Sequence, residues 1–376
     1  MKALKFYFAA VALLILSLGL SSCSKPNQEP KATVNIACNL PMTGGLGIYG
    51  DSVKNGVELA LADIAKSDPN GPTLNFDWKD NTGDPKNTIS VMQQQYLKTV
   101  DIYVSGVKPQ TMAIKDQIDT KGTPHFVWIF DPFINKNSNN NFRTWVSYYI
   151  EAPVYLGYID QMKAKKIAII YVQLPHTMEE FEQMVIPELK KKGITDIYVD
   201  SYDMTKNDFK DIASKVKKFN PDLIIMNGFM GNLVSMVRAF RPQNLIHNGN
   251  TIAVYDMLDA AKLLGPDELE GIRVVAPRFE TRPDAPVVKE WREKFKTKYK
   301  KEPLFTDPFA YDMAMIINDA AKRLKLPATS KQWIEAIKAT DIKGITGQLK
   351  FDDSGDLLSS SEVGVFKNGK LMPLNK

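Results

Sequence analysis

The sequence predicts an α/β protein made of two doubly wound lobes, each built on a largely parallel sheet. The first observation is an alternation of short β-branched runs with longer amphipathic stretches, which is typical of βαβ units. The second is the almost continuous apolar character of IAIIYV at 167–172 and DLIIMN at 222–227, as in strands covered on both faces. The third is that the series restarts at KAKKIAIIYV, after about five strand–helix units over 33–147.

The predicted elements follow in order along the chain. Strands are expected at 33–38, 74–80, 101–106, 124–130, 166–172, 196–202, 222–228, 251–256 and 271–277. Helices are expected at 51–66, 84–98, 177–192, 207–219, 284–303 and 307–325. Between the two series, 139–155 combines an Asn-rich loop with a predicted aromatic strand and suits a crossing between lobes. Residues 347–357 and 362–370 predict a terminal hairpin, with Asn368-Gly369 as a turn signal.

The N-terminus has the architecture of an export signal. Lys2 and Lys5 precede an apolar core from Phe6 to Leu18, and small residues lead to Cys23. The cysteine makes this segment resemble a lipoprotein signal, in which residues 1–23 end at a lipidated Cys23 and 24–32 form a polar tether. A plain signal peptide or an uncleaved anchor is the alternative. A lipid would attach the protein to a membrane surface without spanning it.

Composition excludes several classes of function. The net charge of +5, or +3 without Lys2 and Lys5, is too small and dispersed to indicate nucleic-acid binding. Cys38 would be the only cysteine left after lipidation, and it is expected to be a buried, inert thiol. The three histidines lie far apart without metal-ligand spacing, and no catalytic motif occurs. We therefore expect no metal, no cofactor and no enzyme, although distant residues of an exported enzyme could still converge.

The loop after the first strand contains Gly45, Gly47 and Gly50 in the pattern G-x-G-x-x-G. A dinucleotide fold places the first glycine almost directly after the strand, whereas here residues 39–44 intervene. The candidate ribose-binding acids, Asp77 and Asp80, come about 27 to 30 residues after Gly50, later than the pattern requires. The glycines therefore do not predict a nucleotide site.

The wider stretch LPMTGGLGIYGDSVKNGVELALADI, at 40–64, resembles the first motif of the branched-chain amino acid type (Leu/Ile/Val-binding) substrate-binding proteins of ABC transporters, which have the type I periplasmic-binding fold. DNTGDPKNTISV, DIYVSGV, FKTKYKKEP followed by FAYDMAMIINDAAK, and ITGQLKFDDSGDL match later family segments in the correct order. The resemblance covers essentially the whole chain after the tether.

The resemblance implies two lobes joined by a three-segment hinge. Lobe 1 would comprise 33–147 and 278–345, and lobe 2 would comprise 148–277 and 346–376. Such proteins close on one small molecule and deliver it to an ABC permease in the membrane. We expect an exported, monomeric protein, lipid-anchored to the outer face of a bacterial cell membrane or in the periplasm. A ligand-sensing module for a membrane receptor is the alternative on the same fold.

The resemblance also implies where the ligand binds, at the carboxyl ends of the strands. Tyr49 would cover the ligand, with lobe packing as its alternative role; Lys108 could pair with an anion or face solvent. The bulky segment at 128–133 includes Trp128 and Phe130, which could instead be core residues. Asp256, or its rival Tyr255, approximates the acid that receives an ammonium group. The predicted ligand-binding residues are Tyr49, Lys108, Gln110, Thr111, Phe130, Asp131, His176, Phe229, Tyr255 and Asp256.

The same positions depart from the pattern of the amino-acid binders. Those proteins usually have serines in the loop that here reads GVKPQT, at 106–111, so the grip on a ligand carboxylate has changed. The ligand is expected to be an amino acid or a related hydrophobic or aromatic carboxylate, and the sequence does not choose between them.

Overall fold

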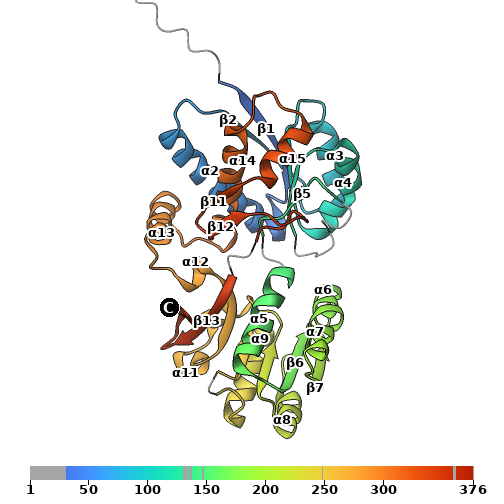
Figure 1. Ribbon diagram of the computed structural model, residues 1–376, viewed down its shortest axis with the longest axis vertical. Helices are drawn as coiled ribbons and strands as arrows, with labels where there is room; N and C mark the ends of the chain where they lie inside the picture. The colour runs from blue at the N-terminus through green and yellow to red at the C-terminus, as the bar shows by residue number, and fades with distance from the viewer. Residues whose placement is uncertain are drawn as a thin grey trace, which may run out of the picture.

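The computed structural model describes residues 31–129, 134, 138–145, 148–247, 249–358 and 361–375, apart from the side chains of 148–150. Figure 1 shows two lobes stacked along the long axis, each a twisted sheet flanked by helices. The predicted fold class is confirmed in both lobes. Cys23 and residues 24–30 of the predicted tether lie outside the described residues.

Lobe 1 contains a five-stranded sheet in the order β2-β1-β3-β4-β5, with every pair parallel. This order reverses between β1 and β3, where doubly wound sheets form a crevice. The strands are β1 (Thr33–Leu40), β2 (Thr73–Asp80), β3 (Ile102–Gly106), β4 (His125–Trp128) and β5 (Asn141–Phe142). The helices are α2 (Gly47–Ser67), α3 (Pro85–Gln95), α4 (Lys108–Lys121), α13 (Pro286–Tyr299), α14 (Thr306–Lys322) and α15 (Ser330–Lys338).

Lobe 2 contains a seven-stranded sheet in the order β14-β13-β10-β9-β8-β6-β7. Its five parallel strands, β7-β6-β8-β9-β10, repeat the order of lobe 1, and an antiparallel hairpin extends the β10 edge. The strands are β6 (Lys166–Val172), β7 (Asp196–Tyr202), β8 (Leu223–Met226), β9 (Thr251–Ala253), β10 (Arg273–Pro277), β13 (Ser361–Lys367) and β14 (Lys370–Pro373). The helices are α5 (Tyr148–Met162), α6 (Pro175–Met178), the π-helix η2 (Glu179–Val185), α7 (Ile186–Lys191), α8 (Lys210–Phe219), α9 (Met230–Phe240), α10 (Met257–Ala260) and α11 (Pro266–Leu269).

Close approach of α2 and α14 organises the core of lobe 1. Most of α14 is buried, and it contacts α2 along its length. At the point of contact α2 has Gly56, where an added Cβ would lie 2.1 Å from the Asp307 carbonyl oxygen. The hydroxyls of Ser52 and Thr306 are hydrogen-bonded where the two helices begin. The lack of a side chain at Gly56 therefore allows α2 and α14 to pack this closely.

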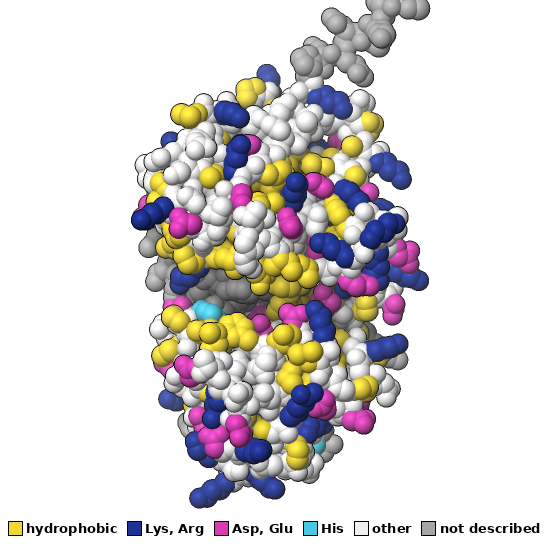
Figure 2. All heavy atoms as spheres, turned by 180° about the vertical axis from the view of Figure 1, so that it is seen from behind, with side chains coloured by type: hydrophobic (Ala, Val, Ile, Leu, Met, Phe, Trp, Pro, Cys, Tyr) yellow, Lys and Arg dark blue, Asp and Glu magenta, His cyan; other side chains and the backbone are white. Residues whose placement is uncertain are grey.

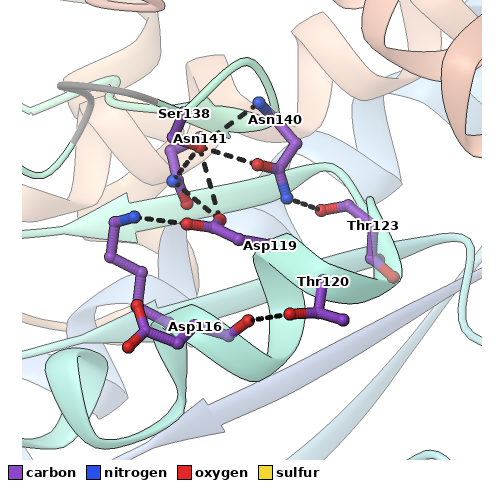
Figure 3. Close-up of polar contacts among 8 residues, drawn as sticks. Asp116, Asp119, Thr120, Thr123, Ser138, Asn140 and Asn141 are labelled. Atoms are coloured by element: carbon purple, nitrogen blue, oxygen red, sulfur yellow. Dashed lines mark hydrogen bonds and ion pairs between the residues drawn. The ribbon is translucent and has the colours of Figure 1, made fainter.

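A polar cluster ties the Asn-rich segment to lobe 1 (Figure 3). The Asn141 amide donates to Asp119 at 3.1 Å, and the Asn140 amide donates to the Thr123 carbonyl at 2.8 Å. Asp119 also accepts from Lys115 on α4. These bonds attach the short strand β5 to lobe 1, so the first crossing comes after Trp145 rather than within the asparagines.

Two expectations about the crossings need correction. The predicted aromatic strand after the asparagines is the helix α5, because Ala152, Tyr155 and Ile159 recur at helical spacing and are buried together.

The last crossing from lobe 1 to lobe 2 comes later in the chain than the predicted boundary at 345/346. Leu349 and Leu357 lie in the core of lobe 1, since β11 (Asp341–Lys343) pairs with β12 (Gln348–Lys350) beneath α14. The chain enters lobe 2 for the last time after residue 358.

Candidate ligand-binding cleft

A cavity of about 520 Å³ lies between the lobes at the carboxyl ends of their strands. Figure 2 shows the cleft as a hollow between the two halves, with hydrophobic side chains gathered along both rims. Its volume falls within the range of small-molecule sites. Lobe 1 and its hinge segments contribute Leu40, Pro41, Leu46, Tyr49, Gly50, Val53, Gly106, Val107, Lys108, Trp128, Ile129, Trp145, Phe305 and Thr306; lobe 2 contributes His176, Phe229, Met230, Tyr255, Asp256 and Asp259.

The glycine-bearing loop forms part of the wall by packing, not by cradling phosphates. Gly47 and Gly50 lie in the first turn of α2. A Cβ added at Gly50 would come 2.1 Å from the Pro41 carbonyl oxygen, so only glycine lets this turn lie against the end of β1. The same turn presents Tyr49 to the cavity, and the side chain of Tyr49 is 43% exposed.

Four aromatic rings cross the cleft in an unbroken series. The ring centroids of Trp128 and Trp145 are 5.2 Å apart, and those of Trp145 and Phe305 are 4.9 Å apart. Tyr255, in lobe 2, contacts Phe305 edge-on at 4.9 Å. These distances are in the favourable range for aromatic pairs. The series therefore makes one continuous aromatic surface shared by both lobes.

The lobe 2 wall is acidic. Asp256 and Asp259 line the cavity at the start of α10. Burial, followed by the charge of Asp259, raises the pKa of Asp256 to about 7. Asp256 therefore titrates near neutral pH, and its negative charge is most favourable when a cation or a hydrogen-bond donor lies beside it.

Two buried polar groups of the wall have no hydrogen-bond partner among the described residues. They are the Trp128 indole N–H, from lobe 1, and the Tyr255 hydroxyl, from lobe 2. A buried polar group left unpaired costs free energy, so a bound solute that pairs with either group gains affinity. Burial also raises the pKa of Tyr255, which keeps its hydroxyl protonated.

The structure brings together six of the ten predicted ligand-binding residues. These line the cavity: Tyr49, Lys108, His176, Phe229, Tyr255 and Asp256. Gln110 and Thr111 point into lobe 1 instead. The Gln110 amide donates to the Gly83 carbonyl, and the Thr111 hydroxyl is 2.9 Å from that of Ser105. Phe130 and Asp131 lie outside the described residues.

Sequence reasoning missed the hinge-side wall. Trp145 and Phe305 come from segments between regular elements, and Thr306 is the first residue of α14, so neither strand endings nor helix periodicity marks them. Phe305 precedes α14 by one residue, so a search of the positions before long helices would have raised it. The sequence left open whether Trp128 is a core residue or a cleft residue. In the structure it has both roles, because it packs in the core of lobe 1 and also lines the cavity.

Within the described part of the chain, no group of His, Cys, Asp and Glu side chains is arranged to hold a metal ion. The same residues include no helix with the length and apolar character of a membrane span.

Comparison with known proteins agrees with this geometry. Residues 33–360 match the family described as "Periplasmic binding protein". The Leu/Ile/Val-binding protein of Citrobacter freundii is 23% identical over 363 residues, covering 93% of this chain and 95% of the relative. An ABC transporter substrate-binding protein from Sphaerobacter thermophilus superposes with a TM-score of 0.76 at 14% identity, over 91% of this chain and 97% of that one.

A second solved structure is the solute-binding protein of an ABC transporter from Rhodopseudomonas palustris BisB5, in complex with 3,4-dihydroxybenzoic acid. It superposes with a TM-score of 0.71 at 19% identity, covering 90% of this chain and 95% of that one. The family consists of solute-binding proteins rather than enzymes, and its name indicates a location outside the cytoplasm. This chain belongs to the periplasmic binding protein family, because the family matches most of the length of the chain and the structure has a cleft between two lobes.

Proposed function

We propose that this protein captures one small molecule in the cleft by closing its lobes and delivers it to an ABC permease in the membrane. The observation that carries the proposal is the composition of the cavity wall, which takes residues from both lobes. A ligand that contacts both walls binds the closed form more tightly than the open form, so binding shifts the equilibrium toward closure.

The ligand is an amino acid or a related hydrophobic or aromatic carboxylate. The aromatic surface made by Trp128, Trp145, Phe305 and Tyr255 supports an apolar or ring-bearing body. The names of similar proteins point the same way, since one is a Leu/Ile/Val-binding protein and another was solved with a dihydroxybenzoic acid.

A thermal-shift screen of amino acids, aliphatic acids and aromatic acids tests this function. A ligand that binds the native state stabilises it by mass action, and the unfolding temperature rises. At a ligand concentration of a hundred times the Kd, the free energy of unfolding increases by about 2.7 kcal/mol. At least one member of the library is expected to stabilise the purified protein. If none does at millimolar concentration, the proposed ligand class is wrong.

Replacing Tyr49 with Ala is expected to weaken binding of a ligand from that screen by about tenfold, because the ring loses its contact with the bound solute. The unfolding temperature of the empty protein should hardly change, since Tyr49 is 43% exposed. Isothermal titration measures the first effect and calorimetry the second. Leu97→Ala, at an exposed lobe 1 position away from the cavity, is the matched control. A large loss of stability would mean that Tyr49 is a packing residue.

We also propose that Cys23 carries a lipid that anchors the protein to the membrane, as the resemblance of residues 1–23 to a lipoprotein signal supports. Cys23→Ser is then expected to release the protein from the membrane fraction, because the proposed lipid is what holds the protein to the membrane. Cell fractionation and immunoblotting measure the distribution. Cys38→Ser, at the buried cysteine, serves as the control and should leave the membrane association intact. Unchanged membrane association of the Cys23 variant would refute the anchor.

A further inference from the structure

The side chain of Trp128 lies where the sheet of lobe 1 meets the cavity. Trp128 is the last residue of β4 and pairs with Gly106 at the end of β3, and both residues line the cavity. A Cβ added at Gly106 would lie 3.1 Å from the Trp128 Cβ and 2.9 Å from the Leu40 Cδ2, so the missing side chain leaves room for the indole. The Trp128 carbonyl also accepts a hydrogen bond from the Val107 N–H at 3.1 Å. The lobe 1 wall is therefore built around this indole.

Packing holds the indole ring in place. Trp128 is 7% exposed, and its ring meets that of Trp145 edge-on, with 5.2 Å between the centroids and 68° between the planes. Trp145 packs in turn against Phe305 and Phe309, at 4.9 and 6.3 Å. Close packing of this kind keeps a side chain in one rotamer, so the direction of the Trp128 N–H is set before a solute arrives.

The indole N–H of Trp128 is buried and has no hydrogen-bond partner among the described residues. An indole N–H can only donate, so the group that pairs with it has to be an acceptor. Trp291 and Trp333 also have N–H groups without a described partner, but they lie in the core of lobe 1 and do not line the cavity. A solute in the cleft can therefore reach the N–H of Trp128 and not theirs.

Other polar side chains of lobe 1 near this wall already have partners inside the protein. The loop at 106–111 lacks the serines of the amino-acid binders, and the side chains of Gln110 and Thr111 bind other groups of lobe 1. The Thr306 hydroxyl lines the cavity but is hydrogen-bonded to that of Ser52. The Trp128 N–H is thus a buried donor of lobe 1 that remains for a solute to use.

We propose that Trp128 is a specificity-determining residue of the cleft, whose indole N–H donates to a carbonyl or carboxylate oxygen of a ring-bearing solute. The ring of the solute then lies against Trp145 and Phe305, and the rest of it extends along the aromatic surface toward Tyr255 in lobe 2. A solute with an ammonium or methyl group at the lobe 1 end leaves the N–H unpaired, so the cleft discriminates against it. The inference rests on the proposed function and deepens it, because it names the protein atom that selects the oxygen.

Nuclear magnetic resonance on the unmodified protein tests the hydrogen bond directly. The chain has five tryptophans, so the isotope-labelled protein has five indole N–H signals, each assigned through the backbone resonances of its own residue. Benzoate is titrated up to about 10 mM, which covers Kd values into the millimolar range. The Trp128 signal is expected to move downfield as its N–H gains an acceptor, whereas those of Trp291 and Trp333 stay in place. If calorimetry shows that benzoate binds and the Trp128 signal does not move, the proposal is overturned.

Three probes with the same ring separate the acceptor oxygen from its charge. Benzoate and benzamide each carry an acceptor oxygen, with and without a negative charge, and benzylammonium carries none. Benzoate is expected to bind about tenfold more tightly than benzylammonium, with benzamide between them, since hydrogen bonds to charged acceptors are stronger. Equal affinities for benzoate and benzamide would identify the acceptor as a neutral carbonyl and keep Trp128 as its donor. Benzylammonium binding as tightly as both would contradict the proposal.

Two tryptophan variants show whether this N–H causes the preference. Trp128→Phe keeps a flat ring, and it is expected to lower the affinities for benzoate and benzamide about tenfold without changing that for benzylammonium. Trp291→Phe is the matched control, because it removes an N–H that also lacks a described partner but lies in the core, so all three affinities should stay the same. Circular dichroism shows whether each variant folds, and if Trp128→Phe does not, the resonance titration decides. A folded Trp128→Phe protein that binds benzoate as well as the unmodified protein refutes the role of Trp128.

Failure of this inference is distinguishable from failure of the proposed function. If a compound from the earlier screen binds without moving the Trp128 signal, the transport function stands and only the role of Trp128 falls. If no compound binds, both fall.

Discussion

Replacing Arg143 with Ala is expected to lower the free energy of unfolding by about 3–5 kcal/mol, because the change leaves a buried carboxylate without its partner. The Arg143 guanidinium is fully buried and donates two hydrogen bonds to Asp356, at 2.8 and 2.7 Å. Even with this partner, burial keeps the pKa of Asp356 above its ordinary value. Urea unfolding followed by circular dichroism measures the loss.

The position of this ion pair adds to its importance. Arg143 lies just before the first crossing between the lobes, and Asp356 lies just before the last. Arg238→Ala is the matched control, since its pair with Glu268 is on the surface and should cost less than about 1 kcal/mol. The double variant Arg143→Met/Asp356→Leu should recover much of the stability, because it removes both buried charges together. A loss below 1 kcal/mol for Arg143→Ala would contradict this account.

Replacing Gly56 with Ala is expected to destabilise the protein by about 3 kcal/mol, although alanine favours helix formation. The new methyl group would lie 2.1 Å from the Asp307 carbonyl oxygen and 2.8 Å from the Ala310 Cβ. To relieve this steric clash, α2 and α14 would have to move apart. That movement would open the core of lobe 1 and shift the turn that carries Tyr49. The unfolding temperature and the affinity for a ligand are therefore both expected to fall.

A glycine-to-alanine substitution at Gly157 provides the control for Gly56→Ala. Gly157 lies within α5, and a Cβ added there has no neighbour within 4 Å. Gly157→Ala is expected to be neutral or to stabilise by up to about 1 kcal/mol, since it only removes the conformational freedom of glycine in a helix. If the two variants behave alike, helix propensity rather than interhelical contact determines the effect at Gly56.

Two strands of lobe 2, β6 and β7, were predicted from the sequence with their bounds correct. The predicted 166–172 and 196–202 coincide with β6 and β7, because apolar or alternating runs between polar segments leave little freedom in the assignment. The Asn368-Gly369 turn signal is confirmed in the hairpin of β13 and β14, with both residues at positive φ. The predicted pairing of 347–357 with 362–370 is wrong, because β12 pairs with β11 in lobe 1 and β13 pairs with β10 and β14 in lobe 2. The helix α5 was missed because the aromatic residues Tyr149 and Tyr155 favour strands locally, and only burial against η2 and the sheet selects the helix.

The residues of the cavity wall that lie at strand ends could be predicted from the sequence, whereas those in the segments that cross between the lobes could not. Tyr255 and Asp256 lie in the loop after β9, so the rule for open sheets places them at the crevice. Trp145 and Phe305 reach the cavity only because separate segments cross between the lobes there, and no local pattern records that meeting. The charges of Glu180 and Asp256 act on Glu151 from later parts of the chain, and single-sequence reasoning has no means to associate these positions.

The hairpin of β13 and β14 has a consequence for how the chain is made. This hairpin covers the β10 edge of lobe 2, yet in the chain it comes after the whole second visit to lobe 1. Until then β10 exposes unpaired backbone groups, and an open edge of this kind recruits other strands. A nascent chain therefore cannot complete the sheet of lobe 2 until lobe 1 has received its last segment, which ties the completion of one lobe to that of the other.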